Sequence, residues 1–367
     1  MFFAIAILSA FLVTFVLLPV VIKVTKSISL LDLPDRRKVH LEGTPSMGGI
    51  AIFLGFMMAV LITLPTSDLV SNKYLFSAIS LIFFLGIRDD ISSLIAHQKL
   101  ITQVFAATLI VFLADIRLTG LYDIAGIGAL PFGLEYLLSV CVIVTMTNSF
   151  NLIDGIDGLA ASLGIIILLF FSWIFVSVGA MDLALISFAV SGSLLAFLIY
   201  NWHPSKIFMG DTGSMILGFL ISTLAIKVIN VSDGLAINSL ISIQSSVALV
   251  ISCLIVPFYD TLRVFTIRFI QGRSPFSPDR NHIHHSFLKL GLNHAQATQI
   301  LASYNVLMIA LALLLNSTFS NSILLSILFG TTVVFGTLVD HLVSKRKMLG
   351  ATAKLEASKT MAISKSA

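Results

Sequence analysis

Long apolar runs follow one another along this sequence, and the first of them, residues 1–22, contains no charged side chain. A helix of about 20 apolar residues is long enough to cross the hydrocarbon core of a bilayer. Of the 367 residues, 57% are hydrophobic and only 11% are charged. Ordinary soluble proteins are about 25% charged, and a soluble chain could not bury this much apolar surface. We therefore predict an all-α, polytopic integral membrane protein.

Eleven apolar segments are candidate membrane spans. Their approximate bounds are 1–22, 48–65, 74–88, 100–116, 134–149, 159–178, 182–200, 213–229, 239–262, 297–315 and 321–342. Lys23 and Lys26 follow the first segment, whereas a cleavable signal peptide carries its charges in front. The positive-inside rule then places the N-terminus outside, and an odd number of spans places the C-terminus in the cytoplasm.

The distribution of basic residues supports this topology. All but three of the 22 Lys and Arg residues fall in segments that eleven spans place inside, and the exceptions are Lys73, Arg117 and Lys227. One span more or fewer would scramble that asymmetry. We expect residues 1–342 to form a single transmembrane domain with cytoplasmic active-site loops. Residues 343–367, rich in Lys, Ser and Ala, should form a cytoplasmic tail.

The sequence also excludes other classes of protein. Its two cysteines, Cys141 and Cys253, lie within apolar runs and allow neither a disulfide framework nor a cysteine zinc site. The formal net charge of +4 could suit nucleic acid, but basic loops of a membrane protein more often face anionic lipid. We expect the lipid bilayer, and no nucleic acid, as a partner.

Polar motifs lie in the loops that this topology places inside. Asp89 and Asp90 end the third apolar segment, although the helix dipole disfavours carboxylates at a C-terminus. Adjacent carboxylates at a membrane surface are costly unless they are solvated or bind a cation. The pair is therefore either a helix end or part of a functional site. Gly48 and Gly49, after Pro45, fit either a loop that leads into a helix or a backbone that binds an anion.

Four polar residues recur every three positions after the fifth segment, namely Asn148, Asn151, Asp154 and Asp157. Steps of three residues on a helix drift by only about 60°, so neighbouring members share a face. Oxygen ligands on one face suit Mg²⁺, a hard octahedral ion that usually binds substrate phosphates as well. The alternative is a turn with capping residues, since two Asp-Gly steps favour turns.

Two further motifs lie in the same set of loops. Asp211 precedes the eighth segment between small residues and suits either a helix N-cap or a metal ligand. The longest inside loop carries Arg280 with His282, His284 and His285, a cationic cluster that fits phosphate binding. A zinc site in this loop is the alternative, although no cysteine assists it.

One side of the membrane thus collects oxygen ligands for a divalent cation and a basic loop for phosphates. Phosphoryl transfer requires that combination of a metal, cations for the leaving group and a carboxylate near the nucleophile. The sequence contains no Gly-x-x-x-x-Gly-Lys phosphate loop, which argues against an NTPase.

Taken together, the motifs resemble those of the polyprenyl-phosphate N-acetylhexosamine-1-phosphate transferases. The resemblance extends from about Asp32 to Leu292 and rests on Asp89-Asp90, Asn-x-x-Asp-Gly-x-Asp-Gly at 151–158, Phe-Met-Gly-Asp-Thr-Gly-Ser at 208–214 and His-Ile-His-His at 282–285. The last motif resembles the bacterial undecaprenyl-phosphate N-acetylglucosaminyl-1-phosphate transferases. Phospho-muramoyl-pentapeptide transferases usually have three consecutive histidines, and usually a lysine where Leu41-Glu42 stand, whereas Ser286 follows His285 here.

The resemblance implies that UDP-N-acetylglucosamine and undecaprenyl phosphate give undecaprenyl-diphospho-N-acetylglucosamine and UMP, with Mg²⁺ or Mn²⁺ as cofactor. It also implies a first membrane step of O-antigen or common-antigen-type polysaccharide synthesis. The location would be the bacterial inner (cytoplasmic) membrane, with the active site facing the cytoplasm, and a homodimer is suggested. Another UDP-N-acetylhexosamine donor stays an alternative.

Matching the motifs position by position, the resemblance assigns Asn151 and Asp211 to the metal. Catalytic roles fall to Asp89, Asp90, Asp154 and His284, with Asp89 orienting or deprotonating the lipid phosphate. Substrate contacts fall to Asn148, Asp157, Asn201, Phe208, Arg280, His282 and His285. Direct attack by the lipid phosphate and a covalent phospho-Asp89 intermediate both fit. We favour direct attack, because the metal and the cations can supply the electrostatics in one step.

Two other functions compete with this interpretation. A secondary transporter or flippase would need a midplane site on broken helices, whereas these clusters lie at segment ends. A metal transporter or sensor that uses the histidine loop would leave Asp89, Asp90 and Asp211 unexplained.

The remaining ionisable residues receive structural interpretations. Asp260, near an inner segment end, is expected to pair with Arg263 three residues later. Surface or packing positions are expected for the four histidines without an assigned role, His97, His203, His294 and His341.

Overall fold

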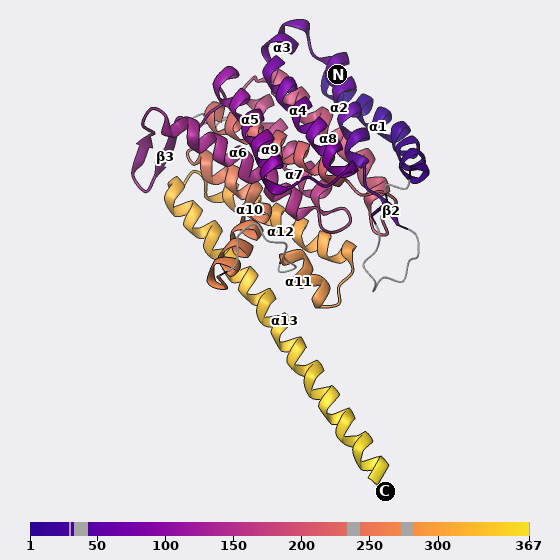
Figure 1. Ribbon diagram of the computed structural model, residues 1–367. Helices are drawn as coiled ribbons and strands as arrows, with labels where there is room; N and C mark the ends of the chain where they lie inside the picture. Colours follow the sequence, from indigo (N-terminus) through magenta and orange to yellow (C-terminus); the bar gives the residue numbers. More distant parts are fainter. Residues whose placement is uncertain (29–30, 33–42, 233–242, 273–281, 367) are drawn as a thin grey trace.

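The fold is described from a computed structural model over residues 1–28, 31–32, 43–232, 243–272 and 282–366 (Figure 1). Most of these residues are helical. The helices are α1 Phe2–Ser27, α2 Gly48–Thr63, α3 Thr66–Ser71, α4 Lys73–Ile91, α5 Ala96–Leu113, α6 Leu134–Ile153, α7 Leu159–Ser177, α8 Met181–Asn201, α9 Gly210–Ser232, α10 Ser246–Ile270, α11 Ile283–Lys289, α12 His294–Leu315 and α13 Asn321–Ser366. Two antiparallel pairs of short strands are present, β1 Leu31–Asp32 with β2 Thr44–Pro45, and β3 Gly120–Ile124 with β4 Ile127–Ala129.

A helix covers most of each predicted apolar segment, which confirms an all-α membrane protein. Among the described residues, nine helices are long and apolar enough to cross a bilayer. Helix α2 is apolar but has only 16 residues, and α4 has 19 residues and ends in Arg88, Asp89, Asp90 and Ile91. The exact number of spans and their direction stay predictions.

Two helices end more than a few residues beyond the predicted segment bounds. Helix α10 continues to Ile270 rather than ending near residue 262, and its predicted start at 239 lies outside the described residues. Helix α13 runs unbroken from Asn321 to Ser366, so the predicted tail after residue 342 continues the last helix (Figure 1). The tail sequence contains no proline and several Ala, Lys, Leu and Glu residues, which have high helix propensity. The polar composition of the tail indicates contact with solvent, which is compatible with a helix.

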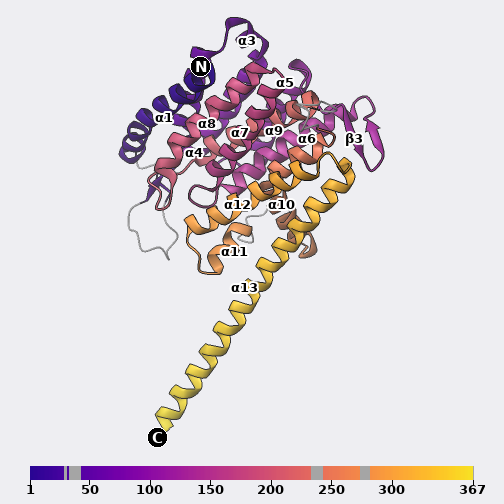
Figure 2. The ribbon, with the colours of Figure 1, turned by 180° about the vertical axis from the view of Figure 1, so that it is seen from behind.

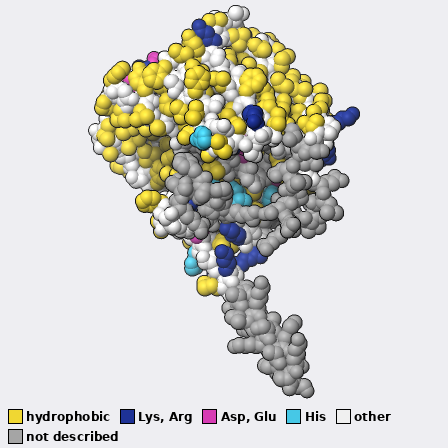
Figure 3. Space-filling model, in the orientation of Figure 1, with side chains coloured by type: hydrophobic (Ala, Val, Ile, Leu, Met, Phe, Trp, Pro, Cys, Tyr) yellow, Lys and Arg dark blue, Asp and Glu magenta, His cyan; other side chains and the backbone are white. Residues whose placement is uncertain are grey.

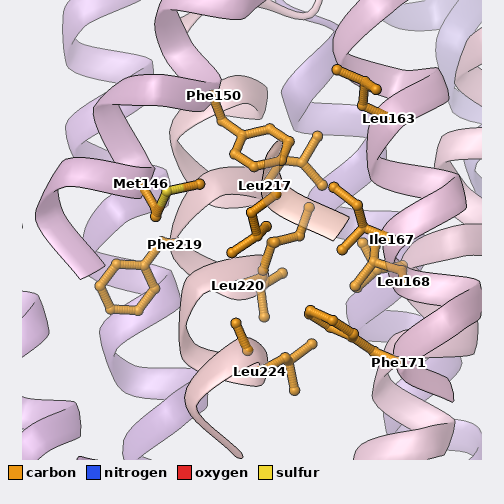
Figure 4. Packing of buried hydrophobic residues seen from close by; sticks show 14 of the residues in the cluster. Met146, Phe150, Leu163, Ile167, Leu168, Phe171, Leu217, Phe219, Leu220 and Leu224 are labelled. Carbon is orange, nitrogen blue, oxygen red and sulfur yellow. The ribbon is translucent and has the colours of Figure 1, made fainter. Parts of the chain in front are cut away.

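Helix α9 lies at the centre of the bundle and packs against α2, α4, α6, α7 and α10. In the most apolar 18-residue stretch of α9, 83% of the residues are buried. Figure 4 shows Met146 and Phe150 of α6 and Leu163, Ile167, Leu168 and Phe171 of α7 around Leu217, Leu220 and Leu224 of α9. A helix that is apolar on all sides is typical of a position surrounded by other helices.

Glycines allow α2 and α4 to approach the first turn of α9 closely. A Cβ atom at Gly49 would lie 2.1 Å from the backbone nitrogen of Gly213, and one at Gly86 would lie 2.3 Å from the Cα atom of Thr212. Small residues permit this kind of backbone contact between membrane helices. The end of α4 that carries Asp89 and the start of α9 are therefore held together.

Exposed apolar side chains cover much of the bundle (Figure 3). On α1, for example, Leu8, Leu12 and Val16 are 57%, 58% and 66% exposed. Helix α1 packs against α2 and α8 on one side of the bundle, and α10, α12 and α13 pack together on another (Figure 2). Exposed apolar surface of this extent suits lipid contact. Histidine side chains show near the end of the bundle from which α13 projects (Figure 3).

Candidate active site

Asp90 caps the start of α9. One carboxylate oxygen accepts a hydrogen bond from the backbone N–H of Asp211 (2.8 Å), and the other accepts from the N–H (3.1 Å) and the hydroxyl (2.6 Å) of Thr212. Gly210, with a φ of 74°, leaves room for this carboxylate, because a Cβ atom there would lie 2.8 Å from an Asp90 oxygen. The α9 dipole favours the negative charge. The Asp90 carboxylate is therefore unfavourable at the C-terminus of α4 but favourable at the N-terminus of α9.

Asp89 lies beside Asp90 but points into a partly buried ion-pair network. Its side chain accepts a hydrogen bond from the backbone N–H of Leu94 (2.7 Å), and the residue is only 4% exposed. The ammonium of Lys99, on α5, contacts the other Asp89 oxygen and lies 2.9 Å from Asp211 Oδ2. Lys99 therefore bridges the carboxylates that end α4 and begin α9.

Asn151, on the last turn of α6, completes the contact with α9. Its side-chain amide donates hydrogen bonds to Asp211 Oδ1 (2.7 Å) and to the Ser214 hydroxyl (2.9 Å). The two predicted metal ligands, Asn151 and Asp211, are therefore in direct contact. We name the group Asp89, Asp90, Lys99, Asn151 and Asp211 the acidic centre.

Asp154 follows α6 immediately and faces the same carboxylates. Burial raises the pKa of Asp154 well above its ordinary value, and repulsion from Asp211, Asp90 and Asp157 raises it further. In the described part of the chain, Lys99 is the cation that contacts this carboxylate-rich group. The excess of negative charge and the oxygen donors fit a hard divalent ion such as Mg²⁺. Asp211 and Asn151 would hold it, with Asp154 close by.

Asn148 takes a different place from the acidic centre. Its side-chain amide donates to Gln103 Oε1 of α5 (2.7 Å) and to the Val144 carbonyl (2.8 Å). These bonds join α5 to α6, which is a structural use for a residue predicted to bind substrate.

The turn after α6 is fastened to the loop that precedes α9. The buried Asn201 side chain accepts a hydrogen bond from the Gly158 N–H (2.9 Å) and donates to the Ile207 carbonyl (2.9 Å). Phe208 lies in the same loop, and its carbonyl accepts from the Gly48 N–H (3.0 Å). The Gly49 N–H likewise donates to the Met209 carbonyl (2.9 Å), so both glycines serve loop packing in this structure.

Asp157 lies in that turn and contacts two histidines. Its Oδ2 atom is 2.7 Å from His203 Nδ1 and 3.2 Å from His294 Nδ1, and its Oδ1 atom accepts from the Ser205 hydroxyl (3.0 Å). Burial alone would raise the pKa of Asp157, but the contacts with His294, His203 and Ser205 outweigh it and lower the pKa to about 2. His203 and His294, for which surface or packing positions were expected, therefore form a cluster with Asp157.

The described part of the histidine loop packs beside the same turn. His284 is buried, and a Cβ atom at Gly155 would lie 2.4 Å from its Nε2 atom. Burial lowers the pKa of His284 to about 3, so this imidazole is neutral at physiological pH. His285 is half-buried, with its ring centroid 4.3 Å from that of His284. Arg280 lies outside the described residues.

His282 is oriented by a carboxylate of α10. His282 Nδ1 is 2.9 Å from Asp260 Oδ2, and the Ile283 N–H donates to Asp260 Oδ1 (2.7 Å). The expected pairing of Asp260 with Arg263 is wrong, because the Arg263 guanidinium contacts Asp340 of α13. Side chains at positions 260 and 263 diverge far enough for each to find a partner on another element.

Four residues of the site lacked a predicted role there, namely Lys99, His203, Asp260 and His294. Lys99 and the two histidines stood out only as ionisable residues in inside segments. Asp211, which Lys99 contacts, and Asp157, which both histidines contact, lie between 46 and 137 residues away from them in the chain. Asp260 was the strongest available signal, because a carboxylate in an apolar run is costly without a partner.

The chain resembles known proteins over most of its length. Residues 73–229, which run from α4 to α9, match the family described as Glycosyl transferase family 4. A probable undecaprenyl-phosphate N-acetylglucosaminyl 1-phosphate transferase of Bacillus subtilis is 36% identical over 304 residues, covering 81% of this chain and 80% of the relative. A decaprenyl-phosphate N-acetylglucosaminephosphotransferase of Mycolicibacterium smegmatis is 34% identical over 73% of this chain and 71% of its own.

A phospho-N-acetylmuramoyl-pentapeptide-transferase of Clostridium botulinum is 38% identical, but over 52% of this chain and 63% of its own. All three relatives are named for moving a sugar phosphate, and the first two are named for a polyprenyl-phosphate acceptor. The match to the Bacillus protein extends over most of both chains. This chain belongs to the polyprenyl-phosphate N-acetylhexosamine-1-phosphate transferases of glycosyl transferase family 4.

Proposed function

We propose that this protein transfers N-acetylglucosamine 1-phosphate from UDP-N-acetylglucosamine to undecaprenyl phosphate. The products are undecaprenyl-diphospho-N-acetylglucosamine and UMP. The reaction would be the first membrane step of a cell-surface polysaccharide of the O-antigen or common-antigen type. It would take place at the cytoplasmic face of the bacterial inner membrane.

The observation that carries this proposal is the convergence of Lys99 and Asn151 on Asp211 at the capped start of α9. The group lies at the ends of helices α4, α6 and α9, whose apolar bodies form the bundle. A site at helix ends suits a lipid acceptor whose phosphate lies at headgroup level and a water-soluble donor. Both can meet there without a charge crossing the hydrocarbon.

A divalent ion, Mg²⁺ or Mn²⁺, would supply charge neutralisation for the diphosphate when bound by Asp211 and Asn151. Lys99 already lies between Asp89 and Asp211, where its ammonium can bind phosphate oxygens. The neutral and buried His284 can donate or accept a hydrogen bond but adds no charge there. Among the residues that the structure describes, Lys99 thus offers a strong cation on the side of Asp89.

The reaction step follows from these positions. An oxygen of the lipid phosphate forms a bond to the sugar-bearing phosphorus of the donor, and the bond from that phosphorus to the bridging oxygen breaks. UMP leaves with the bridging oxygen and its electron pair. The lipid phosphate has a second pKa of about 6 and is mostly dianionic at neutral pH, so Asp89 serves chiefly to orient it. Direct attack needs no phosphorylated Asp89, and the Asp89 carboxylate stays free to keep its contact with Lys99.

The donor assignment depends on the histidine loop and on the extent of the matches. Ser286 follows His285, and the relatives named for N-acetylglucosamine match 81% and 73% of this chain. The pentapeptide-transferase relative matches 52%. These differences favour N-acetylglucosamine over a muramoyl-pentapeptide donor.

The direct test uses the purified full chain with undecaprenyl phosphate, Mg²⁺ and a panel of UDP-sugars. The panel contains UDP-N-acetylglucosamine, UDP-N-acetylgalactosamine and UDP-N-acetylmuramoyl-pentapeptide, and both UMP and the lipid product are followed. We expect UMP with UDP-N-acetylglucosamine only. UMP with a different donor alone would overturn the donor assignment, and no UMP from folded protein with any donor would overturn the proposed reaction.

A further inference from the structure

Two imidazoles converge on one carboxylate oxygen at the edge of the site. His203 Nδ1 and His294 Nδ1 lie 2.7 Å and 3.2 Å from the same Oδ2 atom of Asp157. All three ligand atoms lie within 4.8 Å of one another. His294 Nδ1 also accepts a long hydrogen bond from the Asp157 backbone N–H (3.4 Å), so this nitrogen presents a lone pair towards the same group. A single cation shared by the two nitrogens and the carboxylate oxygen would satisfy all three atoms.

The carboxylate is held from behind in a way that keeps Oδ2 directed at the histidines. The Ser205 hydroxyl donates to Asp157 Oδ1 (3.0 Å), and the Thr298 hydroxyl donates to the Asp157 carbonyl (2.9 Å). Metal-binding carboxylates are commonly fixed by such outer hydrogen bonds. The Asp157 side chain is 7% exposed, whereas His203 and His294 are 35% and 23% exposed, which leaves the histidine side open for an ion to enter.

The donor set differs in chemistry from the acidic centre. Mg²⁺ prefers oxygen ligands, whereas two imidazole nitrogens and one carboxylate are typical of first-row transition metals and zinc. The fourth position would be open to water. We propose that Asp157, His203 and His294 form a second metal site that binds a borderline divalent ion such as Zn²⁺.

An ion in this site would join three segments of the chain. Asp157 belongs to the turn after α6, His203 to the loop between α8 and α9, and His294 is the first residue of α12. The same turn carries Asp154, and Gly155 packs against His284. The metal would therefore fix the framework beside the acidic centre. The family resemblance assigned Asp157 to a substrate contact, and in this structure its Oδ2 atom faces the two histidines. The proposed metal site rests on this geometry and not on which sugar or lipid reacts.

The test is Co²⁺ binding to the purified full chain without a polyhistidine tag, in excess Mg²⁺. Co²⁺ with nitrogen ligands and low coordination number absorbs visible light far more strongly than octahedral Co²⁺ with oxygen ligands, so the spectrum separates the two sites. We expect one strongly absorbing Co²⁺ per chain, displaced by Zn²⁺. His203→Ala and His294→Ala should each abolish the absorption, and Ser205→Ala should weaken binding by about 10-fold.

Three further variants make the result decisive. His97→Ala, at an exposed position of α5, should keep the signal, and so should Asp211→Asn, which alters only the acidic centre. His203→Gln can still donate a hydrogen bond to Asp157 but is a poor metal ligand, so it should fold and lose the signal. Absence of the Co²⁺ absorption in the wild-type chain, or its survival in His203→Gln and His294→Ala, would show that hydrogen bonds alone hold the cluster and would overturn the proposal.

Discussion

Lys99 is the side chain that connects the two ends of the acidic centre, through Asp89 and Asp211. Lys99→Gln removes the charge but keeps a hydrogen-bond donor of similar length. If the ammonium stabilises the diphosphate in the transition state, UMP release should fall by about 100-fold, the usual effect of losing one preorganised donor. Lys73→Gln, at the opposite end of α4, is the matched control and should keep the wild-type rate. Equal rates for both variants would remove Lys99 from the mechanism.

The buried His284 makes the free energy of unfolding depend on pH. Burial lowers the pKa of His284 from 6.5 to about 3. At pH values between these two, the imidazole is protonated in the unfolded chain and neutral in the folded chain. The stability that depends on a neutral His284 is fully present above pH 6.5 and is lost as the pH falls towards 3.

His284→Gln should therefore flatten the fall in the unfolding midpoint between about pH 7 and 5, measured by thermal unfolding in detergent. His97→Gln, on the exposed start of α5, should leave the slope unchanged. An unchanged slope in His284→Gln would contradict the assignment of a buried neutral imidazole.

At the scale of elements, the close approach of α4 to α9 positions the acidic centre. A Cβ atom at Gly86 would lie 2.3 Å from the Cα atom of Thr212, the residue that binds Asp90. Gly86→Ala should push the helices apart and lower both the unfolding midpoint and UMP release. Gly330→Ala is the matched control, because a Cβ atom there meets nothing within 4 Å, and in a helix it should be neutral or stabilise by about 0.5–1 kcal/mol. The same result for both variants would mean that the contact is not tight.

The helices themselves could be predicted from the sequence, because an apolar run of sufficient length has few alternatives in a bilayer. The predicted topology put Asn151 and Asp211 on one side of the membrane, and the family resemblance assigned both to one metal. The structure places them in contact. The continuation of α13 past residue 342 could not be predicted from hydropathy. Hydropathy measures polarity, so it does not detect a helix in a polar segment of residues with high helix propensity.

Pairings between distant elements were the part that the sequence left open. Asp90 looked misplaced on α4 because its partner is the first turn of α9, more than 100 residues later. Asp260 was expected to find its partner on its own helix and instead contacts His282. Spacing rules describe neighbours on one helix, whereas these contacts depend on how helices pack.

For the whole molecule, the positive-inside distribution predicts which face carries the site. In a cysteine-free background, Ser358→Cys should be labelled by a membrane-impermeant thiol reagent only after the cells are opened. Ser67→Cys, on the exposed surface of α3, should be labelled in spheroplasts. The reverse pattern would place the site outside, where a UDP-sugar donor is absent, and would contradict the proposed orientation.

The proposed activity of the whole molecule is phosphoryl transfer at the start of α9. The most direct measurement compares UMP release from UDP-N-acetylglucosamine by the wild-type chain, Asp211→Asn and Asp182→Asn, with folding checked by thermal unfolding. Asp182 lies at the end of α8 away from Asn201 and serves as the matched carboxylate control. We predict that Asp211→Asn folds but loses activity by at least about 100-fold, while Asp182→Asn keeps the wild-type rate. A wild-type rate in Asp211→Asn would contradict the account.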